Sequence, residues 1–329
     1  MRRALTTACL LTLLLPVPVR PEEPPVFVRA FGREGSNPGL FRFPGGVAVD
    51  AQGNAYVVEI LGNRVQKFDA EDGHLLTWTG SVESGAFQEP ADVAVDRQGR
   101  VWVTDRGHNR LVWFDSEGGY LGSLGSALED EFSGPNGLGL HPSQPLLFVA
   151  DTFHGRVRVF DIAGAAPVPV ADYGTQGIEV GHMWQPSDVA VSSKGEIHIA
   201  EPGINRIQIF SRDGRFRLSM GSGGNAPGSF NNPVGISVDQ ADDIYVVDTF
   251  NGRIQKFHRN GEFVFSWGIS QEKIERLNRP LRIAITPEGL VYVCDTPGAV
   301  LDAHRIVVYQ LFTTAIEERS MSHVRSLYR

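Results

Sequence analysis

Short runs of β-branched and aromatic residues alternate with turn residues along almost the whole chain. Within residues 230–268, strands are predicted at 234–238, 244–247, 253–257 and 263–267, separated by polar turns. The unit recurs, and four short strands in about forty residues cannot bury both faces alone. Stacking the units around an axis buries those faces, so the pattern predicts an all-β propeller of antiparallel strands. The six copies begin at Pro44, Pro90, Pro135, Pro186, Pro233 and Pro280.

Each copy carries an acid at the end of its second predicted strand and an arginine at the start of its third. Because these residues recur in every copy, we interpret them as architecture, in pairs that orient the loop between the two strands. The acids are Glu59, Asp105, Asp151, Glu201, Asp248 and Asp295, and the arginines are Arg64, Arg110, Arg156, Arg206, Arg253 and Arg305.

These repeats resemble those of the NHL-repeat family. The text that carries the resemblance includes PGGVAVDAQGNAYVVEILGNRVQKF, PADVAVDRQGRVWVTDRGHNRLVWF and PVGISVDQADDIYVVDTFNGRIQKF. It extends over about residues 27–311 and implies a six-bladed propeller with four antiparallel strands in each blade. The resemblance is specific for the fold and not for an activity, because propellers serve as enzymes, peptide binders and nucleic-acid binders.

The two ends of the repeat region complement each other. Val26–Phe31 has the pattern of a fourth strand without a repeat before it, and the last repeat stops after its third strand. We therefore predict that Val26–Phe31 is the outer strand of the sixth blade and closes the ring, which removes an exposed edge. The propeller is then expected over residues 26–312, followed by a polar C-terminal tail at 313–329.

The N-terminal residues are typical of a secretory signal. Arg2 and Arg3 precede the apolar run Ala4–Leu15, and a proline-rich leader continues to residue 25. Twelve residues are too few for a stable transmembrane helix, although an uncleaved anchor remains an alternative to cleavage. We therefore expect a secreted, periplasmic or cell-envelope protein. Cys294, in a predicted second strand, is expected to be a buried core residue.

The charge balance and the motifs limit the possible functions. A formal net charge of −8 and a pI near 5.6 disfavour a nucleic-acid partner. The NHL family includes a peptidylglycine amidating lyase that holds zinc through histidines placed directly after the repeat proline. This chain departs from that pattern, so the resemblance does not imply lyase activity. The residues at those places are Gly45, Ala91, Asn136, Ser187, Val234 and Leu281.

The next position in each repeat alternates between glycine and a charged residue. The series is Gly46, Asp92, Gly137, Asp188, Gly235 and Arg282. The three charged residues are expected near the propeller axis, with Asn136 beside them. One interpretation is an arginine that neutralises two carboxylates. The other is a polar site for a small ligand or a cation, and oxygen ligands of this kind suit Ca²⁺ better than Zn²⁺. Arg282 argues against a cation, so no cofactor is predicted to be required.

Two functional hypotheses follow. In the first, the protein is a non-enzymatic scaffold that presents one propeller face to a protein, peptide or glycan, although the aromatic side chains there also suit contacts between blades. In the second, it is a metal-dependent lyase or lactonase-like hydrolase that uses Asp92, Asp188 and Asn136. The oligomeric state is not predicted. The candidate face of the first hypothesis comprises Arg106, His108, Phe153, His154, Trp184, Phe250 and Asn251.

Overall fold

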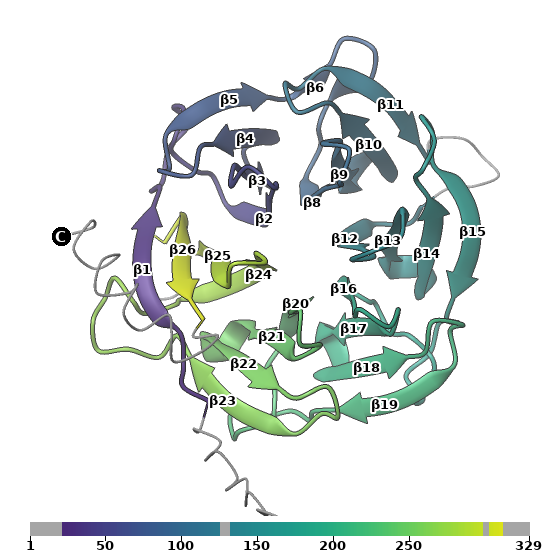
Figure 1. Cartoon of the computed structure of the whole chain (residues 1–329), viewed down its shortest axis with the longest axis vertical. Coiled ribbons are helices and arrows are strands. Elements are labelled where there is room, and N and C mark those ends of the chain that lie inside the picture. Colours follow the sequence, from purple (N-terminus) through teal and green to yellow (C-terminus); the bar gives the residue numbers. More distant parts are fainter. Residues whose placement is uncertain (1–21, 126–131, 299–302, 312–329) are drawn as a thin grey trace, which may run out of the picture.

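The computed structural model describes residues 22–125, 132–298 and 303–311. Six four-stranded antiparallel sheets stand as blades around a central axis, and no α-helix occurs in these ranges (Figure 1). None of the described helical turns has the length and apolar character needed to cross a bilayer. The predicted all-β, six-bladed propeller is confirmed. Most of the predicted leader and the whole predicted tail lie outside the described ranges.

Each blade runs outward from the axis, and the sequence order is repeated from blade to blade. The innermost strands are β2 (Pro44–Val49), β8 (Pro90–Val95), β12 (Pro135–Leu140), β16 (Asp188–Val191), β20 (Pro233–Val238) and β24 (Arg279–Ile285). The second strands are β3 (Ala55–Glu59), β9 (Val101–Asp105), β13 (Leu146–Asp151), β17 (Ile197–Glu201), β21 (Ile244–Asp248) and β25 (Leu290–Thr296). The third strands are β4 (Arg64–Phe68), β10 (Arg110–Phe114), β14 (Arg156–Asp161), β18 (Arg206–Phe210), β22 (Arg253–Phe257) and β26 (Arg305–Gln310).

The outer strands form the circumference of the ring. They are β5 (His74–Trp78), β11 (Tyr120–Leu124), β15 (Val168–Tyr173), β19 (Phe216–Met220), β23 (Phe263–Trp267) and β1 (Val26–Phe31). A small hairpin, β6 (Gly80–Ser81) with β7 (Gly85–Ala86), connects the first and second blades. Four short 3-10 turns follow second strands, and they are η1 (Arg106–His108), η2 (Thr152–His154), η3 (Pro202–Ile204) and η4 (Thr249–Asn251).

The core lies between the blades. Side chains alternate across each strand, and because every blade stands between two others, both of its faces are buried. Six apolar clusters fill the six gaps. In the gap between the second and third blades, Trp102 stacks on Trp113 with ring centroids 5.1 Å apart. Neighbouring innermost strands touch all the way round, so the ring is closed.

The N-terminal strand closes the ring as predicted. β1 pairs antiparallel with β26, from Val26 opposite Gln310 to Phe31 opposite Ile306 (Figure 1). Its two faces contribute to different cores. Phe27 and Ala30 pack into the gap between the fifth and sixth blades, and the other face packs into the gap between the sixth and first.

The loops define two faces of the propeller. We call η face the side that carries η1–η4 and the loops joining each outer strand to the next blade. The opposite side, with the loops between first and second and between third and fourth strands, is the hairpin face. All six predicted acid–arginine pairs form at the η face, with N···O distances of 2.5–3.1 Å. Each acid also accepts a backbone N–H from the preceding interblade loop, so the pairs are architectural.

The fourth blade departs from the repeat at His198. In the first, second and fifth blades an aromatic residue at this place donates a hydrogen bond to the aspartate that follows the first strand, as Tyr245 does to Asp239. Ser192 replaces that aspartate here, and its hydroxyl accepts the backbone N–H of Glu196 instead. His198 is fully buried and neither ring nitrogen has a hydrogen-bond partner. Burial lowers the pKa of His198 to about 4.

This burial predicts a loss of stability in mild acid. Between about pH 6.5, where histidine titrates in the unfolded chain, and pH 4, the unfolded state binds a proton that the folded state does not. The free energy of unfolding is expected to fall by about 3 kcal/mol from this group over that window. His198→Phe should remove this contribution, since Phe148 occupies the same place in the third blade. Urea denaturation at a series of pH values measures it, with exposed His182→Phe as the control. An unchanged pH profile in His198→Phe would contradict the prediction.

Candidate functional site

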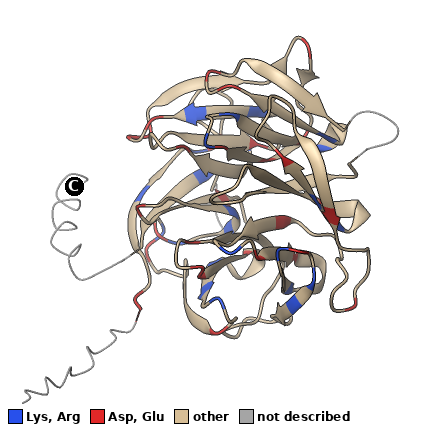
Figure 2. Ribbon diagram, turned by 45° about the vertical axis from the view of Figure 1, so that its right-hand side comes forward, with Lys and Arg blue, Asp and Glu red and all other residues tan. Residues whose placement is uncertain are grey.

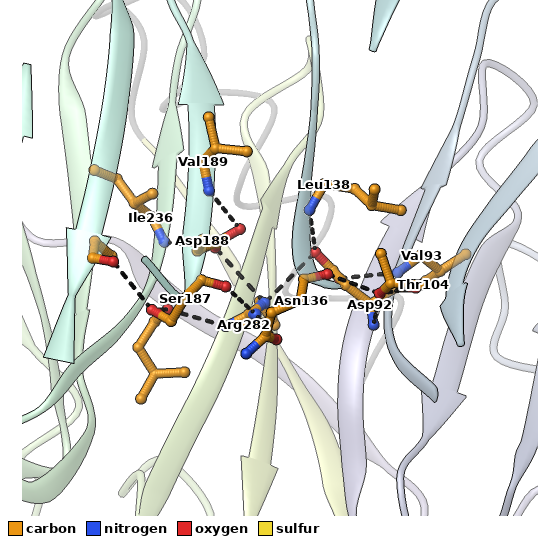
Figure 3. A network of polar contacts seen from close by, with 12 residues as sticks. Asp92, Val93, Thr104, Asn136, Leu138, Ser187, Asp188, Val189, Ile236 and Arg282 are labelled. Carbon is orange, nitrogen blue, oxygen red and sulfur yellow. Dashed lines mark hydrogen bonds and ion pairs between the residues drawn. The ribbon is translucent and has the colours of Figure 1, made fainter. Parts of the chain in front are cut away.

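The three charged residues of the alternating series meet at the axis. Asp92 lies on β8, Asp188 on β16 and Arg282 on β24, and all three side chains are buried (Figure 3). The guanidinium Nε of Arg282 lies 3.5 Å from Oδ2 of Asp92 and 3.7 Å from Oδ2 of Asp188. The second, fourth and sixth blades therefore contribute to one ionic network, which we call the axial network.

The glycines of the series make room for this network. A Cβ on Gly46 would clash with Asp92, and one on Gly137 would clash with Asp188. A Cβ on Gly235 would lie 3.2 Å from the Cα of Arg282 and 2.4 Å from the carbonyl oxygen of Leu281. Each glycine thus leaves space for the charged residue of the following blade. The alternation seen in the sequence has a steric cause.

Each carboxylate of the axial network joins two blades. Oδ1 of Asp92 accepts the N–H of Val93 in its own strand, and Oδ2 accepts the N–H of Leu138 in the next blade, both at 2.9 Å. Asp188 makes the equivalent contacts with Val189 and Ile236, also at 2.9 Å (Figure 3). These two aspartates therefore bridge the second to the third blade and the fourth to the fifth.

Arg282 joins the sixth blade to these two pairs of blades. Its Nη2 donates to Oδ1 of Asn136 at 2.7 Å and to the carbonyl oxygen of Ser187 at 2.8 Å. Its Nη1 donates to the carbonyl oxygen of Val234 at 3.0 Å. The guanidinium thus contacts the third, fourth and fifth blades from the sixth. Asn136, predicted to lie beside the charged residues, does so.

The electrostatics reflect two carboxylates sharing one buried cation. The pKa of Asp188 is raised to about 7, because burial and the charge of Asp92 raise it by more than Arg282 and the backbone hydrogen bonds lower it. The pKa of Asp92 is raised by burial as well, against the opposing charge of Arg282. Cys294 lies nearby, and burial holds the pKa of its thiol well above the usual value, so it remains a protonated core residue as predicted.

The donor set does not fit a metal ion. A cation at the axis needs free carboxylate or amide oxygens. Here the positive charge between Asp92 and Asp188 is the guanidinium of Arg282, and the amide oxygen of Asn136 accepts a hydrogen bond from it. Nε of Arg282 has ion-pair contacts and no hydrogen-bond partner, so the network balances its charges internally and closes the axis near its η-face end.

The predicted face residues lie on the η face but do not converge on one point. Arg106 and His108 belong to η1, Phe153 and His154 to η2, and Phe250 and Asn251 to η4, while Trp184 lies in the loop before β16. The two histidines each place Nδ1 2.9 Å from the acid of their own blade, and the side chain of Asn251 donates to Asp248 at the same distance. Arg106 contacts Glu89 at 3.3 Å. These polar residues stabilise turns in separate blades.

The apolar members of this face have exposed neighbours that sequence reasoning missed. Phe153 and Phe250 are each 54% exposed, and Leu61, at the equivalent place in the first blade, is 53% exposed. The signal was present in the sequence, because the second residue after the repeat acid is apolar in the first, third and fifth blades. The interblade loops of the same face add the exposed residues Val82, Ile178, Val180, Ile269 and Ile274.

Comparisons with known sequences support the repeat assignment. Residues 77–223 match the family model described as SMP-30/gluconolactonase/LRE-like region, and residues 230–257 match the NHL repeat. A 52-residue segment is 38% identical to the protein brain tumor of Drosophila melanogaster, and it covers 16% of this chain and 5% of that protein. The chain thus spans only a small part of that relative.

Solved structures share the architecture at low sequence identity. A streptogramin B lyase is 18% identical with a TM-score of 0.58, covering 87% of this chain and 89% of its own. A gluconolactonase from Xanthomonas campestris is 16% identical with a TM-score of 0.59, covering 89% and 99%. A Bacteroides thetaiotaomicron protein of unknown function is 14% identical with a TM-score of 0.66, covering 87% and 75%. At these identities the likeness concerns the fold. The chain is therefore a six-bladed β-propeller, and parts of its sequence are similar to the SMP-30/gluconolactonase/LRE-like region and to the NHL repeat.

Proposed function

We propose that this propeller is a non-enzymatic interaction scaffold that binds a protein or peptide through its η face. The observation that carries the proposal is the distribution of exposed apolar side chains. Of the thirteen large ones in the described ranges, eight lie on η-face loops and five on outer strands. Exposed apolar side chains are unfavourable in water, and a face on which they gather is a candidate interaction site.

The arrangement on the η face suits an extended partner. Leu61, Phe153 and Phe250 occupy equivalent places in alternate blades, so they surround the axis at similar radius. A cavity of about 290 Å³ adjoins Phe250 and is also lined by Ile269 and Arg276. Arg279 stacks against the ring of Phe250, 5.2 Å from its centroid, which fixes the ring while one side stays exposed. Aromatic anchors beside a pocket are typical of partner recognition.

The enzymatic alternative has weaker support. The lyase and gluconolactonase among the similar structures make a propeller enzyme reasonable, but the fold alone does not imply the activity. The axial network contains its own cation and offers no free oxygen ligands, so we infer that no metal binds there. Acidic and basic residues are interspersed over the blades, which supports a protein partner over a nucleic acid (Figure 2). Export, as the N-terminal residues suggest, remains part of the proposal.

Peptide selection against the immobilised propeller tests this function. We expect selected peptides to lose at least tenfold in affinity when Phe153→Asp and Phe250→Asp are combined, because a charge then replaces the apolar anchors. The matched control is Leu121→Asp, which changes an exposed residue on an outer strand. Fluorescence anisotropy of labelled peptides gives the affinities. Enriched peptides that bind the double variant as well as the unchanged protein would refute the η face as the binding surface.

A further inference from the structure

The hairpin face contains a second candidate site, which lies opposite the η face. It is a cavity of about 730 Å³, within the usual range for small-molecule pockets. Its walls are loops between first and second strands, including residues 96–100, 141–145 and 239–240. Its floor is apolar because five innermost strands end here in aliphatic residues. These are Val95, Leu140, Val191, Val238 and Ile285.

The floor continues into the axis of the propeller. A narrower space of about 260 Å³ is lined by the same five aliphatic residues and, deeper, by Asp92, Asp188 and Arg282. The axial network therefore closes the far end. A ligand on the hairpin face enters an apolar funnel, and the charged groups at its base are already paired with one another within the protein.

Of the two arginines that line the cavity, Arg97 has no ionic partner in the described ranges. Arg97 lines the cavity and is exposed, and its guanidinium donates only to the carbonyl oxygens of Pro142 and Ser143 in the neighbouring blade. No carboxylate in the described ranges forms an ion pair with it. Arg100, on the same loop, differs because it pairs with Asp96 at 2.7 Å. Arg97 is therefore held in place by neutral groups while its charge remains available.

A neutral histidine lies beside this cation. Nδ1 of His141 accepts the backbone N–H groups of Ser143 and Gln144 at 3.1 and 3.2 Å, so its ring proton is on Nε2. Burial lowers the pKa of His141, and the charges of Arg212 and Arg97 lower it further. The positive charge of this part of the rim therefore comes from arginine, and the neutral histidine adds a hydrogen-bond donor.

The acids of the rim are engaged elsewhere. Asp239 accepts the hydroxyl of Tyr245 and backbone N–H groups of its own turn. Asp96 accepts the indole N–H of Trp102 as well as its bond from Arg100. Neither carboxylate pairs with Arg97, so an anionic group from outside the chain can pair with it without displacing an internal ion pair.

We propose that the hairpin-face cavity binds a small amphipathic monoanion, with its apolar body on the aliphatic floor and its carboxylate or sulfonate against Arg97. The chemical class follows from the combination of an apolar funnel, one lining arginine whose charge is available and a base closed by the axial network. This site is independent of the proposed η-face function. A medium-chain carboxylate such as decanoate has the required chemistry and size.

Displacement of the fluorescent anion 1-anilinonaphthalene-8-sulfonate tests the site, with probes below their micelle concentrations. Decanoate should displace the dye at lower concentration than decanol, and decyltrimethylammonium should be weakest. Arg97→Gln should weaken decanoate at least tenfold and leave decanol within twofold, because only the charge contact is lost. Gln144→Trp, on the cavity wall, should weaken both ligands by filling space. The control is Arg42→Gln, an exposed arginine on the η face.

The outcomes separate clearly. Equal binding of decanoate and decyltrimethylammonium, or undiminished decanoate binding by Arg97→Gln, would overturn the proposal. Dye binding that is lost in Phe153→Asp with Phe250→Asp but kept in Gln144→Trp would place the ligand on the η face and overturn it too. Arg97 and Gln144 are both exposed, so the variants are expected to fold, and a thermal melt of each verifies this.

Discussion

Replacing Arg282 with methionine is expected to lower the free energy of unfolding by about 3–5 kcal/mol at pH 8. The substitution leaves two buried carboxylates without their cation, and removing one partner of a buried ionic group costs more than the ion pair itself contributes. It also removes the arginine's hydrogen bond to the amide oxygen of Asn136 and one of the two hydrogen bonds that each of the carbonyl oxygens of Ser187 and Val234 accepts. Urea denaturation of purified protein, followed by tryptophan fluorescence, measures the loss.

The dependence on pH distinguishes this cause from a simple loss of contacts. Asp188 already has a pKa near 7, raised from the value in the unfolded chain, so its stabilising contribution is present below about pH 4 and is lost as the pH rises through 7. Without Arg282 both carboxylates prefer the protonated form even more strongly. The cost of the substitution should therefore shrink between pH 8 and pH 4.5.

Removing one carboxylate supplies the matching rescue. Asp188→Asn in the Arg282→Met background should recover part of the stability at pH 8 and little at pH 4.5. The reason is that only the ionised carboxylate of Asp188 is unfavourable in the buried site, and at pH 4.5 this carboxyl group is already protonated. Arg42→Met, which changes an exposed arginine, is the control. A cost that is independent of pH, or a double variant no more stable than Arg282→Met, would show that the charge balance of the axial network does not govern stability.

The fold was predictable because its signals are periodic and local. The repeat proline, the acid and the arginine each mark a strand end, so their spacing gave six blades directly. The missing outer strand of the last repeat predicted the role of Val26–Phe31. The acid–arginine pairs followed from their presence in every blade, and the structure confirms all six.

The residues of the axial network were predictable from the sequence, but the partners of their hydrogen bonds were not. The series that alternates glycine with Asp92, Asp188 and Arg282 placed these residues near the axis, but the sequence could not show that each aspartate binds the backbone of the next blade. That depends on the spacing between neighbouring innermost strands. His198 was missed because its unusual feature is an absence: Ser192 stands where the aspartate of the first, second and fifth blades stands, and the missing hydrogen bond is visible only in the folded blade.

The hairpin-face cavity could not be predicted from the sequence, because the residues that line it are of common types. Its aliphatic floor consists of strand ends whose sequence is that of ordinary core residues, and its walls are short loops that contain no recognisable motif. Arg97 appeared as one surface charge among many. Its significance comes from contacts with the carbonyl oxygens of Pro142 and Ser143, which lie in another blade and only meet it in the folded ring.

Removing β1 is expected to have an even larger effect than removing Arg282. A chain that begins at residue 32 leaves β26 as an open edge and uncovers two cores, since Phe27 and Ala30 pack on one side and Val28 and Phe31 on the other. Losing two half-buried phenylalanines, together with the strand pairing, should cost on the order of 5 kcal/mol or more. The ion pair of 2.6 Å between Arg29 and Asp72 of the first blade is lost as well.

Urea denaturation of chains beginning at residues 22 and 32 measures this cost, and a chain of residues 22–311 controls for truncation elsewhere. The shorter chain should also associate, because an unpaired strand edge accepts other strands. A synthetic peptide of residues 22–33 should restore the midpoint when added in excess, since it supplies the missing strand without a covalent link. A peptide in which Phe27 and Phe31 are both alanine should fail to do so. Equal urea midpoints for the two chains would mean that the pairing of β1 with β26 does not hold the sixth blade in the ring. The contacts between the innermost strands would then be sufficient to close the ring.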